Sequence, residues 1–313
     1  MQVPFANAYV LTGPTCSGKS QLGLELAERL NAEIVAMDSM TLYRGMDVGT
    51  AKPSPAERTR VSHHLIDVLD PWQSANVAWW LNRANECCAR IERRGKKVLF
   101  VGGTPLYVKA LLYGLFEGPA ADAALRQRLT DEAERHGGLA LHARLAQVDP
   151  ATAARLHPND VRRVVRALEV WELTGKPMNA WQQQWNKPSD APTLSRLRTL
   201  AQRVLWLDLP RPELYARIDV RVKAMFAAGL VEEVRALRQL PHPPSREASQ
   251  AIGYKEVFAC LDGRADLPAT IRRMQTRTRN FAKRQITWFR HLAPCRPITK
   301  ELAFAALGLT MGV

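Results

Sequence analysis

The chain of 313 residues has only five cysteines, and no two of them stand in a C-x-x-C pair. An odd count without such spacing argues against a disulfide framework and against a structural zinc site. The sequence also lacks a run of about 18 apolar residues and the basic and apolar segments of a secretory signal. These absences argue against secreted disulfide scaffolds and membrane-spanning proteins, so we expect a protein of the reducing cytoplasm.

Acidic residues are also in short supply, with 30 Asp and Glu against 44 Lys and Arg, which gives a net charge of +14. The hydrophobic content of 46% and the charged content of 24% are those of a globular protein. Such an excess of positive charge favours a polyanionic partner, of which nucleic acid is the commonest. A uniformly basic surface is the plainer alternative, but the basic residues are clustered.

The stretch GPTCSGKS at residues 13–20 matches the phosphate-loop pattern G-x-x-x-x-G-K-[ST]. It follows an apolar run at 8–12 and precedes a helical pattern at 21–30, which is the context that such a loop requires. Its glycines let backbone N–H groups turn inward around an anion, and the helix adds its positive dipole end. We therefore expect Lys19 to neutralise phosphate oxygens and Ser20 to bind a Mg²⁺ ion.

Strands and helices alternate along the first third of the chain. Apolar patterns predict strands at 8–12, 32–39 and 96–104, and a helix at 105–115. Strand–loop–helix repeats imply right-handed crossovers and a parallel sheet. We therefore predict an α/β fold, a P-loop NTPase-like parallel sheet covered by helices.

The pattern changes to purely helical over about 121–187, and 181–193 reads as a linker. A strand at 202–210 then returns, and helices are expected at about 211–239, 248–261 and 269–292. The predicted domains are a core formed by 1–120 and 191–313, interrupted by an all-helical insertion at 121–190.

Two polar residues end predicted strands on the ligand-binding edge of the sheet. Asp38 can serve as a general base or metal ligand there, although capping the next turn is an equally simple role. Thr104 precedes Pro105, the arrangement of a helix N-cap. Gly102 and Gly103, however, allow a ligand to approach the backbone closely. Because ligands bind at the carboxyl ends of parallel strands, we predict that Asp38, Thr104 and the phosphate loop line one cleft.

Basic residues gather in two helical segments. In 160–171 the arginines Arg162, Arg163 and Arg166 point away from an apolar stripe. The segment 272–290 has seven basic residues and no acidic one: Arg272, Arg273, Arg277, Arg279, Lys283, Arg284 and Arg290. A solvated basic face is the plainer interpretation, and the interleaved aromatic residues are more often core. We nevertheless expect the second segment to bind an RNA backbone.

Seven ordered segments together resemble one family, the tRNA dimethylallyltransferases (tRNA isopentenyltransferases) of the bacterial type. The segments are GPTCSGKS, VAMDSMTLYRGMDVGTAKP, HHLIDVLDP, VGGTPLYVKALLYGL, LHPNDVRRVVRALEV, ASQAIGYKE and AKRQITWFR. They run across nearly the whole chain, so the match is far more specific than a phosphate loop alone. The chain has no C-terminal zinc-finger pattern, which eukaryotic relatives carry.

The resemblance implies transfer of a dimethylallyl group from dimethylallyl diphosphate to the exocyclic amine of an adenosine. That adenosine lies immediately 3′ of the anticodon in tRNAs that read codons beginning with U, and the product is isopentenyladenosine. In this family Asp38 corresponds to the general base, Thr104 to a contact with diphosphate and nucleotide, and Arg221 to the group that stabilises the leaving diphosphate. The diphosphate, held with Mg²⁺, would contact Gly13, Pro14, Thr15, Cys16, Ser17, Gly18, Lys19, Ser20 and Arg217.

The resemblance also implies contacts with the anticodon stem-loop of tRNA. They fall on Asp38, Ser39, Met40, Thr41, Thr104, Arg126, Arg162, Arg163, Val164, Val165, Arg166, Gln250, Ala251, Ile252, Gly253, Tyr254, Lys255, Lys283, Arg284, Gln285, Ile286, Thr287, Trp288, Phe289 and Arg290. Thr41 departs from the family, since many members have Gln there. We expect a monomer, because a partner of this size already covers much of the surface.

Two other functions use part of the same pattern. A small-molecule or nucleoside kinase would explain the phosphate loop and Asp38, but it does not account for the net charge of +14. A non-catalytic RNA-binding module would explain the charge, but it does not require Lys19, Ser20, Asp38 and Thr104 together.

Overall fold

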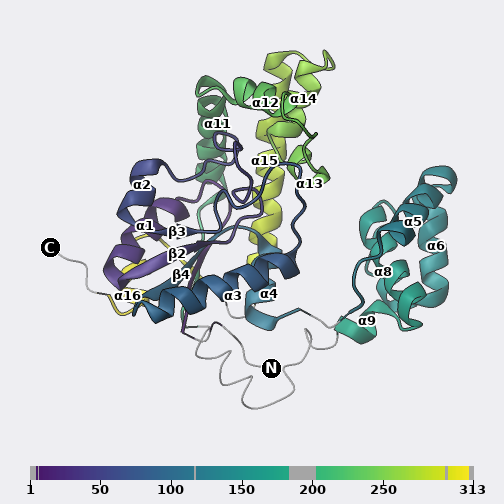
Figure 1. Cartoon of the computed structure of the whole chain (residues 1–313), viewed down its shortest axis with the longest axis horizontal. Helices are drawn as coiled ribbons and strands as arrows, with labels where there is room; N and C mark the ends of the chain where they lie inside the picture. The colour runs from purple at the N-terminus through teal and green to yellow at the C-terminus, as the bar shows by residue number, and fades with distance from the viewer. Residues whose placement is uncertain (1–4, 6, 116–117, 183–201, 293–294, 310–313) are drawn as a thin grey trace. The chain divides into compact units, whose positions relative to one another are not determined.

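A computed structural model describes residues 5, 7–115, 118–182, 202–292 and 295–309 (Figure 1). The chain divides into two compact units, one formed by residues 1–112 and 195–313 and the other by residues 113–194. The sequence predicts the second unit at 121–190, so its borders differ from the predicted ones by a few residues. Within the described residues, no helix is long and apolar enough to cross a membrane.

The first unit is built on a six-stranded sheet in the order β3-β2-β4-β1-β5-β6, in which every pairing is parallel. The predicted parallel sheet is therefore confirmed. Leu11 of the central strand lies opposite Val101 on one side and Leu205 on the other. The strands are β1 Tyr9–Thr12, β2 Ala32–Ala36, β3 His63–His64, β4 Lys97–Gly102, β5 Val204–Leu207 and β6 Arg296–Ile298.

Side chains that alternate along the strands bury both faces of this sheet. Leu99 and Leu205 pack into the cluster that also contains residues of α1 and α16. Their neighbours Phe100 and Trp206 point to the opposite face, where α3 and α15 lie; the Trp206 ring is 6.0 Å from the Phe289 ring of α15. The loop that follows β1 therefore emerges between α1 on one face and α15 on the other.

The helices of the first unit are α1 Lys19–Leu30, α2 Pro55–Arg60, α3 Val77–Arg93, α4 Pro105–Tyr113, α11 Arg211–Ala227, α12 Leu230–Arg238, α13 Arg246–Ser249, α14 Tyr254–Leu261, α15 Leu267–Arg290 and α16 Ala303–Ala306. The single helix predicted at 211–239 is wrong, because Gly229 adopts a left-handed φ of 94° between α11 and α12. The helix predicted at 248–261 is likewise divided, into the end of α13 and α14.

The second unit is helical throughout its described residues 118–182, as its sequence pattern predicts. Its helices are α5 Ala123–His136, α6 Gly138–Val148, α7 Pro150–Ala153, α8 Val161–Thr174 and α9 Met178–Trp181. A core that includes Leu129, Leu145, Val164 and Leu168 holds them together. Residues 183–193 of the predicted linker lie outside the described residues.

Candidate active site

The phosphate loop connects β1 to α1 and leaves hydrogen-bonding groups available at its centre. Gly18 begins α1 with a left-handed φ of 89°, and no side chain caps the N–H groups of the first turn. The Ser17 hydroxyl is buried, and it has no hydrogen-bond partner in the described part of the chain. Buried polar atoms are normally paired, so an anionic oxygen in the loop would satisfy groups that are now unpaired.

Lys19 reaches back across this loop and donates a hydrogen bond to the carbonyl oxygen of Pro14, at 3.1 Å. Burial and the nearby guanidinium of Arg221 lower the pKa of Lys19 to about 8, while Asp38 and Cys16 act in the opposite direction. Nearby negative charge therefore does not balance the positive charge of the Lys19 ammonium, and a bound diphosphate would provide the missing negative charge.

Two arginines one turn apart on α11 lie against the same loop. The Arg217 Nη1 atom is 3.6 Å from the position that a Cβ would take on Gly18. The Arg221 Nη1 atom is 3.8 Å from the Cys16 Sγ atom. Arg217 also donates to Glu213 at 2.7 Å, so part of its charge is already paired. Residues about 200 positions apart in the sequence thus bring three cations to one loop.

Asp38 and Thr104 follow the adjacent strands β2 and β4 and are joined through the backbone. Thr104 Oγ1 accepts a hydrogen bond from the Ser39 N–H at 3.1 Å, and the Thr104 N–H donates to the Met37 carbonyl at 3.2 Å. One Asp38 oxygen, Oδ1, accepts from the Met40 N–H at 2.8 Å. No donor in the described part of the chain is paired with Oδ2, which leaves that oxygen able to accept a proton.

The glycines before Thr104 are required by close packing of the protein against itself. A Cβ on Gly102 would stand 2.1 Å from the Met37 carbonyl oxygen. A Cβ on Gly103 would stand 2.6 Å from Nε2 of Gln285. The close approach predicted for a ligand is therefore an approach of neighbouring protein segments, which fixes Thr104 beside Asp38.

Gln285 of α15 joins the phosphate loop to the segment that precedes Thr104. It is 2% exposed, its Oε1 accepts from the Thr15 N–H at 2.9 Å, and its Nε2 donates to the Gly103 carbonyl at 2.6 Å. Both ends of the Gln285 amide are used inside the protein, and its predicted contact with tRNA stays a prediction. Sequence reasoning could not find this role, since the three residues have no common local pattern.

Replacing Gln285 by leucine is expected to destabilise the protein, because the Thr15 N–H and the Gly103 carbonyl lose their partners. Each buried polar group left unpaired costs about 1–3 kcal/mol. Thermal unfolding should therefore begin several degrees lower, and the KM for the ligand of the phosphate loop should rise. The exposed Thr287→Ala variant on the same helix is the control, and an equal loss in both variants would contradict this role.

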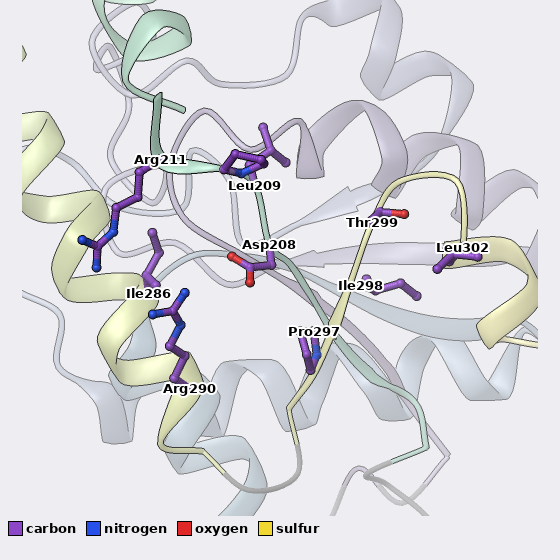
Figure 2. Close-up of a pocket in the computed structure, with 10 residues that line it drawn as sticks. Asp208, Leu209, Arg211, Ile286, Arg290, Pro297, Ile298, Thr299 and Leu302 are labelled. Atoms are coloured by element: carbon purple, nitrogen blue, oxygen red, sulfur yellow. The ribbon is translucent and has the colours of Figure 1, made fainter. Parts of the chain in front are cut away.

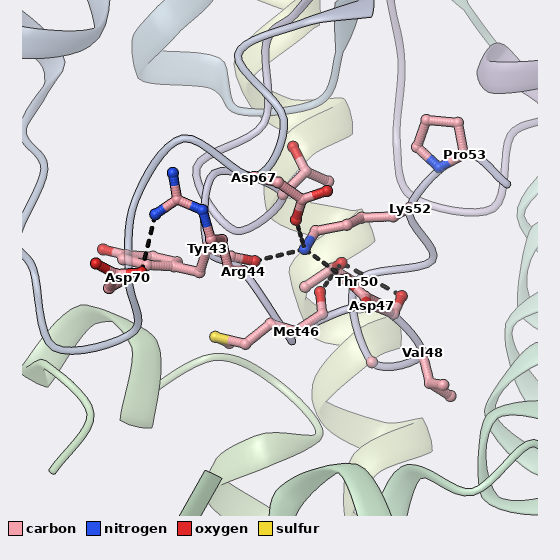
Figure 3. Close-up of polar contacts among 12 residues, drawn as sticks. Tyr43, Arg44, Met46, Asp47, Val48, Thr50, Lys52, Pro53, Asp67 and Asp70 are labelled. Atoms are coloured by element: carbon pink, nitrogen blue, oxygen red, sulfur yellow. Dashed lines mark hydrogen bonds and ion pairs between the residues drawn. The ribbon is translucent and has the colours of Figure 1, made fainter. Parts of the chain in front are cut away.

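The segment after Asp38 is held by a buried lysine (Figure 3). The Lys52 side chain is 2% exposed and donates to Asp47 at 2.6 Å, to Asp67 at 2.5 Å and to the Tyr43 carbonyl. Arg58 pairs with the second oxygen of Asp67 at 2.7 Å. These ion pairs fix the segment 43–53 against the segment around Asp67, and sequence reasoning missed them.

A carboxylate from α12 holds the same segment from a second direction. Glu233 Oε2 accepts from the N–H groups of Asp47 and Val48 at 2.8 and 2.7 Å. Its Oε1 accepts from the Gly49 N–H at 3.1 Å and from the Tyr254 hydroxyl at 2.6 Å. The Tyr254 side chain is fully buried in this contact, and the predicted contact of Tyr254 with tRNA stays a prediction.

Several other residues predicted to contact RNA also have partners inside the protein. Arg126 and Arg166 both bind the fully buried Glu169, at 2.9 and 2.6 Å, so they balance a buried charge. The predicted residues whose side chains are buried within their own unit are Thr41, Val164, Val165, Ala251, Ile286 and Phe289. Packing explains the burial of Val164, Val165, Ile286 and Phe289, because apolar residues inside a basic helix face the core. Arg162 and Arg163 are exposed, as predicted, and Arg163 also pairs with Asp160 at 2.9 Å.

The basic helix α15 is partly neutralised by other helices. Arg277 binds Glu256 of α14, and Arg279 binds Asp219 of α11 at 2.5 Å. The sequence segment contains no acidic residue, so these partners could not be read from it. Lys283 and Arg284 are exposed, and neither forms an ion pair with any described residue. They are therefore available for contact with a polyanion, as are the exposed Arg272, Arg273 and Arg290 of the same helix.

A cavity of about 760 Å³ lies at the carboxyl ends of β5 and β6 (Figure 2). Asp208 after β5, Arg211 at the start of α11 and Arg290 at the end of α15 line it together with apolar residues. Its volume is in the range of small-molecule sites, and its position is the usual ligand-binding edge of a parallel sheet. The sequence did not predict this cavity.

Comparisons with known proteins point to one family. The model of the IPP transferase family matches residues 41–292, and the model described as isopentenyl transferase matches residues 6–67. A tRNA dimethylallyltransferase from Geobacter metallireducens is 49% identical over 281 residues, which cover 90% of this chain and 88% of the relative. One from Pelotomaculum thermopropionicum is 41% identical over 312 residues and covers 96% of both chains.

Solved structures give the same result. The tRNA isopentenylpyrophosphate transferase from Bacillus halodurans superposes with a TM-score of 0.65 and 38% identity, over 93% of this chain and 89% of that protein. A eukaryotic dimethylallyltransferase acting on tRNA gives a TM-score of 0.72 with 28% identity, over 94% of this chain and 73% of that protein. The sites of this chain can therefore be interpreted within an enzyme family.

Proposed function

The chain belongs to the IPP transferase family of tRNA dimethylallyltransferases, and from this premise we propose how its residues carry out prenyl transfer to tRNA. In the proposed reaction a dimethylallyl group leaves dimethylallyl diphosphate and joins the exocyclic amine of the adenosine immediately 3′ of the anticodon. The observation that carries the proposal is that Lys19 and Arg221 both lie against the phosphate loop, at the same edge of the sheet as Asp38, which follows β2. No observation favours phosphoryl transfer by a kinase.

Asp38 is the proposed general base. An exocyclic amine conjugated to a purine is a weak nucleophile, so its proton must leave as the new C–N bond forms. Oδ1 is held by the Met40 N–H, and Oδ2 has no partner among the described residues. Oδ2 is thus oriented by the turn and available to take the proton. Thr104 lies beside it and can donate its hydroxyl proton, because Oγ1 already accepts from Ser39.

The phosphate loop is proposed to hold the leaving diphosphate. The C–O bond of the donor breaks as the C–N bond forms, and negative charge develops on the diphosphate oxygens. Lys19, Arg217, Arg221 and the N–H groups at the start of α1 are positioned before the reaction to stabilise that charge. Arg217 already pairs with Glu213, whereas Arg221 has no carboxylate partner among the described residues. We therefore assign Arg221 the larger share of the charge stabilisation.

A Mg²⁺ ion fits this donor set. No group of three His, Cys, Asp or Glu side chains among the described residues could hold a metal. Mg²⁺ commonly binds through one or two protein oxygens, with substrate phosphates and water as the other ligands. The exposed Ser20 hydroxyl at the start of α1 is the proposed protein ligand, and the ion would neutralise charge on the diphosphate when bound.

The nucleic-acid substrate is proposed to be the anticodon stem-loop of a tRNA that reads codons beginning with U. Its adenine must leave the base stack to reach Asp38, because that residue lies at the edge of a covered sheet. Lys283 and Arg284, together with Arg162 and Arg163, are exposed basic residues that can contact its backbone. Such a substrate places the enzyme in the cytoplasm, and we propose that it acts as a monomer.

The direct test is a transfer assay with purified protein, dimethylallyl diphosphate, Mg²⁺ and unmodified tRNA. The expected result is a mass gain of one dimethylallyl group on the adenosine 3′ of the anticodon. Hydrolysis of ATP or movement of its phosphate, with no gain of mass on tRNA, would overturn the proposal in favour of a kinase.

The pKa of Lys19 gives the loop a predictable pH dependence. A diphosphate binds the protonated ammonium better, so affinity should be constant below the pKa of about 8 and fall as pH rises above it. One linked proton corresponds to a loss of up to about tenfold per pH unit. Titration of inorganic pyrophosphate by calorimetry between pH 7 and pH 10 measures this change, and the Lys19→Met variant should lack it. A flat profile in the unmodified protein would remove Lys19 from the site.

Neutralising Lys283 and Arg284 together, as Lys283→Gln and Arg284→Gln, is expected to weaken tRNA binding and reduce its salt dependence. Each lost phosphate contact lowers the slope of log K against log salt by about 0.7 to 0.9. Filter binding between 50 and 200 mM salt measures the slope. Arg93→Gln at the end of α3 is the matched loss of an exposed charge. An unchanged slope in the double variant would exclude this part of α15 from the RNA surface.

A further inference from the structure

A second reactive cluster lies at the β3 edge of the sheet, and it shares no residue with the proposed active site. It consists of Glu33 on β2, His64 on β3, and Cys87 and Arg90 on α3. His64, Cys87 and Arg90 line a cavity of about 400 Å³ that opens between β3 and α3. A nucleophile, a base and a charge-stabilising group therefore face one space that the prenyl transfer does not use.

Glu33 fixes the orientation and the protonation of His64. Its side chain is 4% exposed and binds Arg94 and His64, each at 2.6 Å. Burial raises the pKa of Glu33, but the hydrogen bonds from Arg94 and His64 outweigh it and lower the pKa to about 2. An ionised carboxylate only accepts hydrogen bonds, so the His64 Nε2 atom must carry a proton. The Nδ1 atom is then the one that can take a proton from a neighbour.

The neighbour is Cys87. The Arg90 Nη2 atom lies 3.4 Å from the Cys87 Sγ atom and donates to it. Burial raises the pKa of Cys87, but hydrogen bonds with His64 and Arg90 lower it by more, and the same contact with Cys87 raises the pKa of His64. Imidazole and guanidinium beside a thiol are the surroundings that stabilise a thiolate. The surroundings of Cys87 and His64 therefore favour the thiolate and the imidazolium over the neutral thiol and the neutral imidazole.

Cys88 provides an internal comparison. It is 4% exposed against 3% for Cys87, it stands next to Cys87 on the same helix, and it does not line the cavity. Burial raises the pKa of the Cys88 thiol, with the charges of Cys87 and Glu92 acting in the same direction. Two adjacent cysteines of equal exposure thus have opposite chemical surroundings, so a difference in their reactivity would arise from the cluster.

We propose that Cys87 is an oxidation site for hydrogen peroxide that enters the cavity between β3 and α3. The Cys87 sulfur attacks one peroxide oxygen, an S–O bond forms and the O–O bond breaks. The leaving hydroxide takes a proton from the His64 imidazolium and departs as water, which leaves a sulfenic acid on Cys87. Peroxide is the oxidant, since its oxygen is reduced as the sulfur is oxidised. The small size of peroxide suits a nearly buried sulfur, while larger disulfides would not reach it.

The test exposes the folded full-length protein to hydrogen peroxide for a series of times. Each sample is then unfolded in denaturant that contains dimedone, because dimedone is too large to reach a nearly buried sulfur, and is analysed by peptide mass spectrometry. Dimedone reacts with sulfenic acids, and fragment ions of the peptide that contains both Cys87 and Cys88 locate the oxidised cysteine. At pH 7 we expect Cys87 to be labelled at least about ten times faster than Cys88, because an ordinary thiol is only a few per cent ionised. Equal rates at the two cysteines, or labelling of Cys16 without Cys87, would overturn the proposal.

Three variants separate the effect of the cluster from the effect of exposure alone. Cys87→Ser should remove the label, and Cys88→Ser should leave the Cys87 rate unchanged. His64→Gln, which keeps a donor toward Glu33, should slow Cys87 oxidation by about tenfold or more. If circular dichroism shows that His64→Gln is unfolded, the rate of Cys87 oxidation in the unmodified protein, measured between pH 5.5 and pH 9, still tests the proposal. A profile that matches free cysteine would exclude a thiolate stabilised by His64 and Arg90.

Discussion

Replacing Asp38 by asparagine is expected to reduce the rate of prenyl transfer by about 10²–10⁴-fold, the usual contribution of a general base. The substitution keeps an oxygen that can accept from the Met40 N–H, so the turn after β2 should persist. It replaces the oxygen that has no partner in the described structure with an amide nitrogen, which cannot accept a proton. Single-turnover measurement on saturating tRNA isolates this loss from substrate binding.

The same variant should bind tRNA with nearly unchanged affinity. Asp70→Asn is its control, because the Asp70 side chain is 34% exposed and its only ion-pair partner among the described residues is Arg44, at 2.8 Å. Exposed pairs of this kind contribute up to about 1 kcal/mol to stability, so activity should remain close to that of the unmodified protein. A rate for Asp38→Asn near that of Asp70→Asn would show that Asp38 is not the base.

Replacing Arg221 by glutamine is expected to lower kcat by about 10²–10³-fold, the range found when a single charge-stabilising group is removed. Its guanidinium lies against the phosphate loop near Cys16, where charge on the leaving diphosphate develops. The effect on the KM for dimethylallyl diphosphate should be smaller, because the ground-state diphosphate still meets Lys19 and Arg217. Steady-state kinetics with each substrate varied in turn measures both quantities.

Lys223→Gln is the matched control for this loss of charge. Lys223 is exposed on the same helix, so its replacement changes the net charge by the same amount without touching the loop. Thermal unfolding of both variants checks that α11 remains packed. If Arg221→Gln raises the KM and leaves kcat intact, Arg221 binds the donor but does not stabilise its departure.

Local sequence patterns were sufficient for much of the fold. Strand β1, the loop and α1 follow from the apolar run and the glycines around Lys19, and the parallel sheet follows from their repetition. Strands β3 and β6 have two and three residues, which is too short for any periodic signal. Helix α3 was not predicted although Trp80, Ala84 and Cys87 recur at helical spacing, so its signal was present in the sequence.

The candidate site was predictable in its residues but not in its connections. Asp38, Thr104 and Lys19 each stand at a strand or loop end that local patterns identify. Gln285 and Glu233 each join segments about 180 residues or more apart, and no local pattern encodes such a contact. For the same reason, basic helices read as RNA contacts proved to contain residues with acidic or apolar partners from other helices.

The Gln285 amide has a consequence for how the two substrates bind. Its helix α15 also presents Lys283 and Arg284, so the hydrogen bond to the Thr15 N–H joins the donor loop to the proposed RNA surface. A shift of α15 on RNA binding would alter that hydrogen bond and hence the affinity of the loop for diphosphate. Thermodynamic reciprocity then requires diphosphate to change RNA affinity by the same factor. The two substrates are therefore expected to bind cooperatively, with Gln285 as the shared link.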